Sequence, residues 1–308
     1  MPIRRVFFLH KFRQDALLFA CRRYILIKYD KLCELKMKVR KMYAFQSYFL
    51  DKPLVKGRIF DVFEPAEGVP VKDVAIFFVH GGGWRAGSRT GFYEIMEAFG
   101  KLGYITCTTD YRLNVNGFEQ LADIRESYDC FVDILKKRNH SCRIAVHGSS
   151  AGAHLASLLC CAKPGECGEN IDKVKYPEVR PEMAFLQATP YNFKHWEGMM
   201  PPFWDQMQGV AGVKYAENPE PYERLSLENF IREDNPRIFF MEAELEHLFP
   251  SELTCKIARK HREMNIGSQW KVFSRVEHGF FYELKRKMQL EAFDDICKFL
   301  EGNLHTEY

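Results

Sequence analysis

The sequence, 308 residues long, predicts an α/β protein: a mostly parallel, doubly wound sheet with helices on both faces. Short apolar runs recur along the chain with helical segments between them, which is the order that a parallel sheet requires. Residues 74–79 (VAIFFV) are apolar throughout, as expected of a central strand that is covered on both sides. Residues 143–146 lead through a glycine-containing turn into small and apolar residues at helix spacing, which indicates a strand–turn–helix unit.

Strands are expected, in chain order, over residues 42–50, 57–63, 74–79, 104–110, 143–146, 183–188, 238–241 and 270–276. The first two alternate aromatic and polar residues in the manner of a hairpin. Residues 119–137 are expected to form an amphipathic helix, because apolar side chains recur there at spacings of three and four: Leu121, Ile124, Tyr128, Phe131 and Leu135. Further helices are expected over residues 250–264 and 282–300.

The length of the chain suits one large α/β domain, which we place over residues 42–308. Residues 191–235 interrupt the alternation of strands and helices with short pieces rich in Trp, Met, Pro and Phe. This segment is too apolar for a disordered linker and too irregular for the sheet. We therefore expect a helical lid over an active site.

Residues 1–41 are expected to form a basic helical arm, with twelve Lys or Arg against three acidic residues. Two interpretations stay open: a helix that packs on the body and completes the lid, or a segment that contacts an anionic surface. The whole chain has a net charge of only +3, which does not indicate a nucleic-acid partner. We expect no membrane partner, and a homo-oligomer is compatible with the sequence.

The sequence shows no secretory signal, since charges break every apolar run near the N-terminus, and no run has the length of a transmembrane helix. The ten cysteines include the adjacent Cys160 and Cys161 but no C-x-x-C pair. This pattern is typical of reduced, buried thiols rather than of disulfides or a zinc site. We expect a cytoplasmic protein that needs no metal ion and no organic cofactor.

The most informative motif is residues 147–152 (HGSSAG), which matches G-x-S-x-G with Ser150 at its centre. A strand before this motif and a helix after it are the context of a nucleophile elbow. In such a turn the serine backbone is strained, only glycine fits on either side, and the serine Oγ projects freely. Ser150 is therefore the candidate nucleophile, with a chance match in a glycine-containing turn as the alternative.

A second motif, residues 80–84 (HGGGW), directly follows the apolar run 74–79. Acyl transfer builds negative charge on a carbonyl oxygen, and fixed backbone N–H donors stabilise that charge. Consecutive glycines expose such amides without side chains that would block a substrate. The loop matches neither the P-loop pattern nor G-x-G-x-x-G, which argues against a phosphate site.

A serine nucleophile needs a base, and ten histidines compete for this role. We choose His278, because it follows the last expected strand, where a loop can bring its imidazole to the carboxyl edge of the sheet. His80 is expected to anchor the glycine loop, and His147 and His154 to pack internally. Arm, loop, lid or surface positions are expected for His10, His140, His195, His261 and His305.

The base in turn needs a carboxylate, which fixes its tautomer and stabilises the imidazolium. Three glutamates follow the penultimate expected strand: Glu242, Glu244 and Glu246. The first two are expected at the end of the strand itself, whereas Glu246 lies furthest along the loop that leads to Pro250. We favour Glu246 as the acid, with Glu244 and a solvated acidic loop as the alternatives.

Together these motifs resemble those of the α/β-hydrolases, and in particular the hormone-sensitive-lipase-like esterases with an HGGGW loop. Four blocks match that family in order and separation: HGGGW at 80–84, DYRL at 110–113, HGSSAG at 147–152 and EHGF at 277–280. The resemblance covers about residues 56–300. Ala243 and Glu246 depart from it, since Gly and Asp are common there, and Asn114-Val115-Asn116 stands in place of Ala-Pro-Glu.

The resemblance implies an α/β-hydrolase fold with a catalytic triad of Ser150 as nucleophile, Glu246 as acid and His278 as base. It also implies an oxyanion hole formed by three backbone amides: Gly82, Gly83 and Ala151.

From these residues we expect a serine carboxylesterase that hydrolyses small or medium acyl or aryl esters through an acyl-enzyme intermediate. Its partner would be a small-molecule ester. Two alternatives remain: an arylformamidase-like amidase of the same fold, and a non-catalytic ligand-binding protein on a hydrolase scaffold. The second is disfavoured because such proteins usually lose the serine or the histidine, and this chain has both.

Overall fold

The computed structural model describes residues 45–51 and 57–307. By its contacts the chain divides into two units, Met1–Phe45 and Gln46–Tyr308. The basic arm expected over residues 1–41 lies outside the described residues, so its helical character and its part in a lid stay predictions. Within the described ranges, no helix combines the length and the apolar character that crossing a membrane requires.

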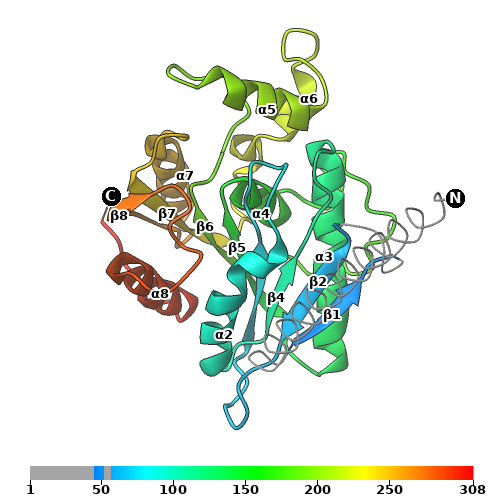
Figure 1. The fold of residues 1–308 in the computed structure, drawn as a ribbon, viewed down its shortest axis with the longest axis vertical. Coiled ribbons are helices and arrows are strands. Elements are labelled where there is room, and N and C mark those ends of the chain that lie inside the picture. Colours follow the sequence, from blue (N-terminus) through cyan, green and yellow to red (C-terminus); the bar gives the residue numbers. More distant parts are fainter. Residues whose placement is uncertain (1–44, 52–56, 308) are drawn as a thin grey trace, which may run out of the picture. The chain divides into compact units, whose positions relative to one another are not determined.

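An eight-stranded sheet forms the centre of the second unit (Figure 1). Its strands, in spatial order, are β1 (Phe45–Phe49), β2 (Ile59–Phe63), β4 (Thr106–Thr109), β3 (Val74–Val79), β5 (Arg143–Ser149), β6 (Met183–Gln187), β7 (Arg237–Leu245) and β8 (Gln269–Glu277). Strands β2 and β4 pair antiparallel, and every neighbouring pair from β4 to β8 is parallel. The prediction of a mostly parallel sheet is confirmed.

The strand order changes direction at β3, which has β4 on one side and β5 on the other. In open α/β sheets, ligands bind beyond the carboxyl ends of the strands at such a point, because the loops that leave the two strands diverge there. The glycine loop 80–84 follows β3, and Ser150 follows β5. The topology therefore brings the two motifs together although about 70 residues separate them in the sequence.

Helices cover both faces of the sheet, as predicted for a doubly wound fold. They are α2 (Tyr93–Lys101), α3 (Gly117–Lys137), α4 (Ala151–Cys161), α7 (Ser251–Glu263) and α8 (Lys287–Leu300). Alternate residues of β3 show the two layers: Phe77 packs against Phe131 of α3, and Phe78 packs against Phe99 of α2. On the face of Phe77, α4 and α7 join the same apolar cluster, and on the other face α8 packs against α2 and β7.

Two helices differ from expectation. Helix α2 was not predicted, although Ile95, Met96 and Phe99 have helical spacing and are fully buried. Helix α8 begins at Lys287 instead of residue 282. The Gln289 side chain accepts hydrogen bonds from the Lys285 and Arg286 amides, at 2.9 and 2.8 Å. This cap ends the preceding turn and starts the helix, so the residues before Lys285 are free for other contacts.

Short helices fill the segment expected to form the lid: α5 (Pro201–Ala211), α6 (Glu220–Arg224) and the 3-10 turn η2 (Leu227–Phe230). Figure 1 shows α5 and α6 in yellow-green, away from the strands, and the two helices are in contact through Trp204 and Tyr222, whose ring centroids are 5.6 Å apart. Helix α5 starts with two prolines, which suit the first turn because its amides have no partner within the helix. Gly212 caps its C-terminal end with a φ of 79°, which favours glycine.

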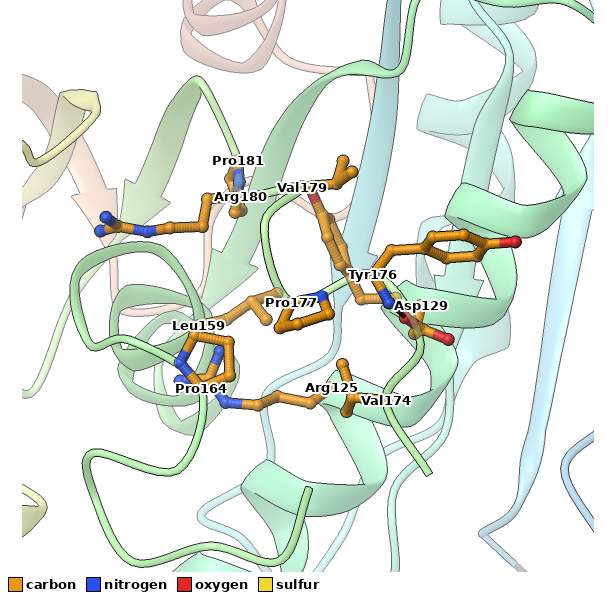
Figure 2. Close-up of a pocket in the computed structure, with 11 residues that line it drawn as sticks. Arg125, Asp129, Leu159, Pro164, Val174, Tyr176, Pro177, Val179, Arg180 and Pro181 are labelled. Atoms are coloured by element: carbon orange, nitrogen blue, oxygen red, sulfur yellow. Dashed lines mark hydrogen bonds between the residues drawn. The ribbon is translucent and has the colours of Figure 1, made fainter. Parts of the chain in front are cut away.

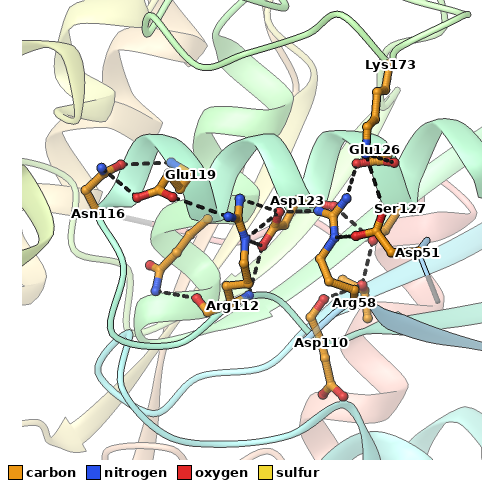
Figure 3. A network of polar contacts seen from close by, with 12 residues as sticks. Asp51, Arg58, Asp110, Arg112, Asn116, Glu119, Asp123, Glu126, Ser127 and Lys173 are labelled. Carbon is orange, nitrogen blue, oxygen red and sulfur yellow. Dashed lines mark hydrogen bonds and ion pairs between the residues drawn. The ribbon is translucent and has the colours of Figure 1, made fainter. Parts of the chain in front are cut away.

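A network of ion pairs holds the DYRL segment that follows β4 (Figure 3). Arg112 donates to both carboxylate oxygens of Asp123, and its own backbone amide donates to the same carboxylate at 2.9 Å. Arg58 binds Asp123 from the other side and Glu126 at 2.5 Å. Asp123 is fully buried, so two guanidinium groups and an amide compensate its lost hydration. The backbone next to the glycine loop is fixed as a result.

Candidate active site

Ser150 lies in the turn between β5 and α4 with φ 55° and ψ −123°, a backbone conformation that is strained for any residue with a Cβ. Its amide donates to the Gln187 carbonyl at 2.9 Å, and its hydroxyl does not cap α4. Gly148 and Gly152, which flank this turn, have no room for a side chain. A Cβ on Gly148 would overlap the Gly152 carbonyl, and a Cβ on Gly152 would overlap the Val79 carbonyl. This is the geometry of a nucleophile elbow.

The glycine loop presents free amides beside this elbow. Gly82 and Gly83 have φ of 114° and 56°, and the Gly82 carbonyl accepts from the Ala86 amide at 2.9 Å. In residues 45–51 and 57–307, the N–H groups of Gly82, Gly83 and Ala151 donate to no protein acceptor. These three N–H groups are therefore available to a ligand, which is what the oxyanion-hole prediction requires.

Buried side chains hold the glycine loop in place. The Tyr111 hydroxyl donates to the His80 carbonyl at 3.0 Å, and the two rings stack with centroids 4.4 Å apart. The Trp84 indole N–H donates to His154 Nδ1 at 3.2 Å. His154 Nε2 in turn lies 2.7 Å from the Leu225 carbonyl next to the lid helix α6, so it must carry the proton. One neutral histidine thus links the glycine loop, α4 and the lid segment.

Burial keeps several histidines neutral. It lowers the pKa of His147 to about 3 and that of His154 to about 4, against the hydrogen bonds each makes to a backbone carbonyl. Their predicted internal positions agree with the structure. The prediction for His261 is wrong: it is fully buried on the inner side of α7, 2.8 Å from Ser268 Oγ, and burial lowers its pKa to about 4. None of these three histidines can serve a base role at the cavity.

His278 follows β8 directly, and Glu246 follows β7. His278 Nδ1 and Glu246 Oε2 are 2.8 Å apart, and the Glu246 side chain is only 3% exposed. The other oxygen of Glu246 accepts the amides of His247 and Leu248 at 3.0 and 2.7 Å. Burial raises the pKa of Glu246, but the His278 contact and the backbone amides outweigh it, and the pKa lies below its usual range. The carboxylate is ionised and can orient the imidazole.

The two other glutamates of this strand have different surroundings. Glu244 is exposed, and its carboxylate accepts the Arg275 amide at 2.6 Å. Glu242 is buried under α7, with Oε1 2.7 Å from Thr254 Oγ1. Burial raises the pKa of Glu242 to about 8, against the contact with Thr254 and with a smaller contribution from the charge of Glu246. Glu242 is therefore a neutral acid at pH 7, and neither residue contacts His278.

Glu242→Gln should stabilise the protein at neutral and alkaline pH. In the folded state Glu242 keeps its proton up to about pH 8, whereas in the unfolded chain it loses the proton near its ordinary pKa of 4.5. The free energy of unfolding therefore falls as the pH rises between these two values. A neutral amide removes that loss. We expect a gain on the order of 1–3 kcal/mol at pH 8 and none at pH 4, measured by chemical denaturation. The exposed Glu67→Gln serves as control, because Glu67 is not among the charges that act on Glu242. A Glu242→Gln protein that is less stable than the wild type at pH 8 would contradict the assignment.

Ser150 and His278 line one cavity of about 610 Å³ together with the glycine loop. This volume falls within the range of about 300–1,000 Å³ that is usual for small-molecule sites. Residues 191–235, the segment predicted to form a lid, contribute Met200, Pro202, Phe203 and Gln206 to its wall. No hydrogen bond joins Ser150 Oγ to His278 among the described residues. Such contacts are often long in a free enzyme and shorten when a substrate binds.

A second, much smaller cavity lies between α3 and the loop before β6, where Asp129, Pro164 and Val179 are among its lining residues (Figure 2). Its volume is about 20 Å³. That is room for about one water molecule. No residue of the predicted triad or oxyanion hole lines it. It does not compete as a substrate site.

Gln206 and Tyr282 are cavity residues with side-chain contacts that were not foreseen from the sequence. Gln206 lies on α5 and its side-chain amide donates to the Gly83 carbonyl, so the lid touches the glycine loop directly. No sequence signal marks this glutamine. Tyr282 was expected to begin the last helix, but it lies in the turn before α8 and lines the cavity. The aromatic run that follows His278 was the available signal.

Comparison with known proteins agrees with this geometry. A family model described as BD-FAE matches residues 60–260, about two thirds of the chain. The chain belongs to this family. The BD-FAE match includes the glycine loop, Ser150 and Glu246, and it ends before His278. No curated protein matches the sequence.

Many solved structures share the fold of this BD-FAE protein. Esterase B from Lactobacillus rhamnosis superposes with a TM-score of 0.70 at 15% identity, over 92% of this chain and 96% of that one. A thermophilic esterase from Thermogutta terrifontis, in a propionate-bound form, superposes with a TM-score of 0.62 at 20% identity, over 85% and 96%. The same esterase phosphonylated by sarin gives 0.62 at 19% identity, over 81% and 92%. The α/β-hydrolase fold implied by the sequence motifs is confirmed.

Proposed function

We propose that this protein is a serine carboxylesterase that cleaves small or medium acyl or aryl esters through an acyl-enzyme. The observation that carries the proposal is the single cavity shared by Ser150, His278 and the glycine loop. Three chemical requirements of acyl transfer meet there. They are a serine with a strained backbone whose hydroxyl caps no helix, an imidazole held by a carboxylate, and N–H donors without a protein acceptor. No other described cavity combines them.

The mechanism follows from the hydrogen bonds. Because Nδ1 of His278 donates to Glu246, Nε2 of the neutral ring carries no proton and can accept one from Ser150. The Ser150 Oγ forms a bond to the ester carbonyl carbon, and the carbonyl oxygen becomes an anion. We assign the stabilisation of that anion to the N–H groups of Gly82, Gly83 and Ala151.

His278 then gives its proton to the departing alkoxide, and the alcohol leaves while the acyl group stays on Ser150. A water molecule takes the place of the alcohol and gives its proton to His278. Its oxygen attacks the acyl carbon, and Ser150 Oγ leaves with the proton from His278. One ester and one water thus become one acid and one alcohol, and the protein returns to its starting state without a metal ion or an organic cofactor.

The lining of the cavity suits an uncharged substrate. Among the described residues that line it, none is Lys, Arg, Asp or Glu, and the lid adds the apolar Met200, Pro202 and Phe203. A charged substrate would lose its hydration there without a compensating partner. The esterase from T. terrifontis binds propionate and butyrate, which are short-chain carboxylates. We infer the same class of acyl group for this protein.

A panel of p-nitrophenyl esters with acyl chains of increasing length tests the function. We expect hydrolysis of the acetate and butyrate esters, and a decline in kcat/KM for chains too long for the cavity. N-formylkynurenine, added to the same panel, distinguishes an arylformamidase-like amidase. Faster turnover of that amide than of any ester would replace the esterase proposal, and binding without any turnover would indicate a non-catalytic protein.

A further inference from the structure

Tyr282 is a polar residue of the cavity to which the proposed mechanism assigns no role. It follows His278 by four residues and precedes the start of α8 at Lys287. Its side chain lines the cavity together with Ser150 and Gly81. Tyr282 therefore belongs to the loop of the base but faces the other two segments of the site.

The hydroxyl of Tyr282 lies where the glycine loop meets the elbow. The Gly81 amide donates to it at 3.0 Å. A Cβ built on Gly81 would lie 2.6 Å from the Ser149 carbonyl, 2.8 Å from the Tyr282 hydroxyl and 3.3 Å from Ser150 Cβ. The phenol oxygen, the elbow and the glycine loop therefore meet around one glycine that cannot carry a side chain.

The protonation of this phenol defines its hydrogen bonds. Burial raises the pKa of Tyr282 above its ordinary value, against the Ser149 hydroxyl and the Gly81 amide, which favour the charged form. The phenol keeps its proton at neutral pH. Its oxygen accepts from the Gly81 amide, and the Ser149 hydroxyl lies near enough to affect its pKa, although no hydrogen bond joins Tyr282 to Ser149 among the described residues. The phenol thus binds the glycine loop beside the residue that precedes the nucleophile.

The ring of Tyr282 is held independently of its hydroxyl. It stacks on Phe92 with centroids 4.7 Å apart and an angle of 16° between the rings. Phe92 is fully buried and packs in turn on His147 of β5, with centroids 5.0 Å apart. A phenylalanine at position 282 can keep these contacts and lose only the hydroxyl.

We propose that Tyr282 is a positioning residue that aligns the glycine loop with the nucleophile for stabilisation of the oxyanion. Its hydroxyl binds the Gly81 amide, while the amides of Gly82 and Gly83 stay free in the same loop. Loss of this hydrogen bond would let the loop shift relative to Ser150. The inference rests on the proposed acyl-transfer function. The negative charge exists only in the transition state, so the loss should affect kcat rather than KM.

The test compares Tyr282→Phe with a matched control, Tyr93→Phe. Tyr93 is also half-buried, its ring packs on Phe63, and its hydroxyl donates to Asp61, but it does not line the cavity. For p-nitrophenyl butyrate we expect Tyr282→Phe to lose about tenfold in kcat with KM unchanged within about twofold. A trifluoromethyl ketone, which forms a tetrahedral adduct with the serine, should bind about tenfold more weakly. Tyr93→Phe should match the wild type in all three measurements.

Equal kcat values for the two variants would overturn the inference, and so would a raised KM with unchanged kcat, which would make Tyr282 a substrate contact instead. If Tyr282→Phe does not fold, p-fluorophenylalanine at position 282 decides, since it keeps the size of the phenol but accepts a hydrogen bond from the Gly81 amide only weakly. We expect a several-fold lower kcat with unchanged KM. An unchanged kcat would overturn the inference.

A phosphonate separates this inference from the esterase proposal. With an alkyl p-nitrophenyl phosphonate, Ser150 Oγ forms a bond to phosphorus, p-nitrophenolate leaves, and the serine proton passes to His278. This reaction uses the nucleophile and the oxyanion donors whatever the natural substrate is. If the wild type cleaves no ester yet reacts about tenfold faster with the phosphonate than Tyr282→Phe does, only the esterase proposal fails. If esters are cleaved and the phosphonate rates are equal, only the role of Tyr282 fails.

Discussion

Ser150→Ala should abolish ester hydrolysis and leave the fold intact. The Ser150 hydroxyl is half-buried at the cavity and caps no helix, so its removal costs little packing. A serine nucleophile forms the covalent bond on which every later step depends, and its loss typically costs about 10⁶-fold in kcat. An alanine at this position has the same backbone requirement as the serine, and α4 should form unchanged. The measurement is kcat on p-nitrophenyl butyrate, with circular dichroism and thermal unfolding to verify the fold.

Ser157→Ala is the matched control. Ser157 lies on the same helix α4, and its buried hydroxyl donates to the His154 carbonyl at 2.7 Å without lining the cavity. This variant should retain wild-type kcat, with a small loss of stability. A Ser150→Ala protein that keeps more than a few per cent of wild-type turnover would refute the assignment of the nucleophile, provided that contaminating wild-type enzyme is excluded by mass spectrometry.

Glu246→Gln should lower kcat by about 10³- to 10⁴-fold, while Glu244→Gln should be close to the wild type. In serine proteases, replacing the triad acid by its amide has an effect of about 10⁴-fold, because the imidazole loses its tautomer and the imidazolium its counter-charge. Glu246 Oε2 is the acceptor for His278 Nδ1 at 2.8 Å. Glu244 is exposed and binds the Arg275 amide instead, so its charge is largely screened by water.

Glu244→Gln and Glu246→Gln make the same chemical change at two positions that are two residues apart. Each variant is therefore the control for the other. Both variants should bind a trifluoromethyl ketone, but only Glu246→Gln should bind it with a large loss of affinity, because the adduct needs a charged imidazole. A large loss of kcat in Glu244→Gln together with a near-normal kcat in Glu246→Gln would mean that Glu244, and not Glu246, is the acid.

Local sequence patterns predicted most of the strands and helices of the fold. Every expected strand with described residues is present, and the observed strands begin or end within a few residues of the expected ones. The two exceptions in length are β5 and β7, which continue to Ser149 and Leu245. Both continue through glycine or charged residues that an apolar run does not include. Backbone pairing with a neighbour, rather than side-chain character, decides where such a strand ends.

The candidate residues of the site could also be predicted from the sequence, because the motifs at Ser150 and at the glycine loop are local. Each requires particular residue types within about six positions, and strand–turn–helix context limits where they can lie. Gly148 and Gly152 must be glycine, because neighbouring backbone atoms lie too close to them for a Cβ. The proposed type of reaction therefore rests on short segments and could be inferred before any distance between them was known.

The sequence by itself determined the alternation of strands and helices, the elbow around Ser150 and the glycine loop, because periodicity and turn residues act over neighbouring positions. Tertiary structure alone decided which glutamate meets His278, how Gln206 reaches Gly83 and how Tyr282 binds the Gly81 amide. The last two contacts join residues 123 and 201 positions apart. Such contacts depend on the path of the whole chain and on the space that neighbouring side chains leave, and no local pattern encodes either.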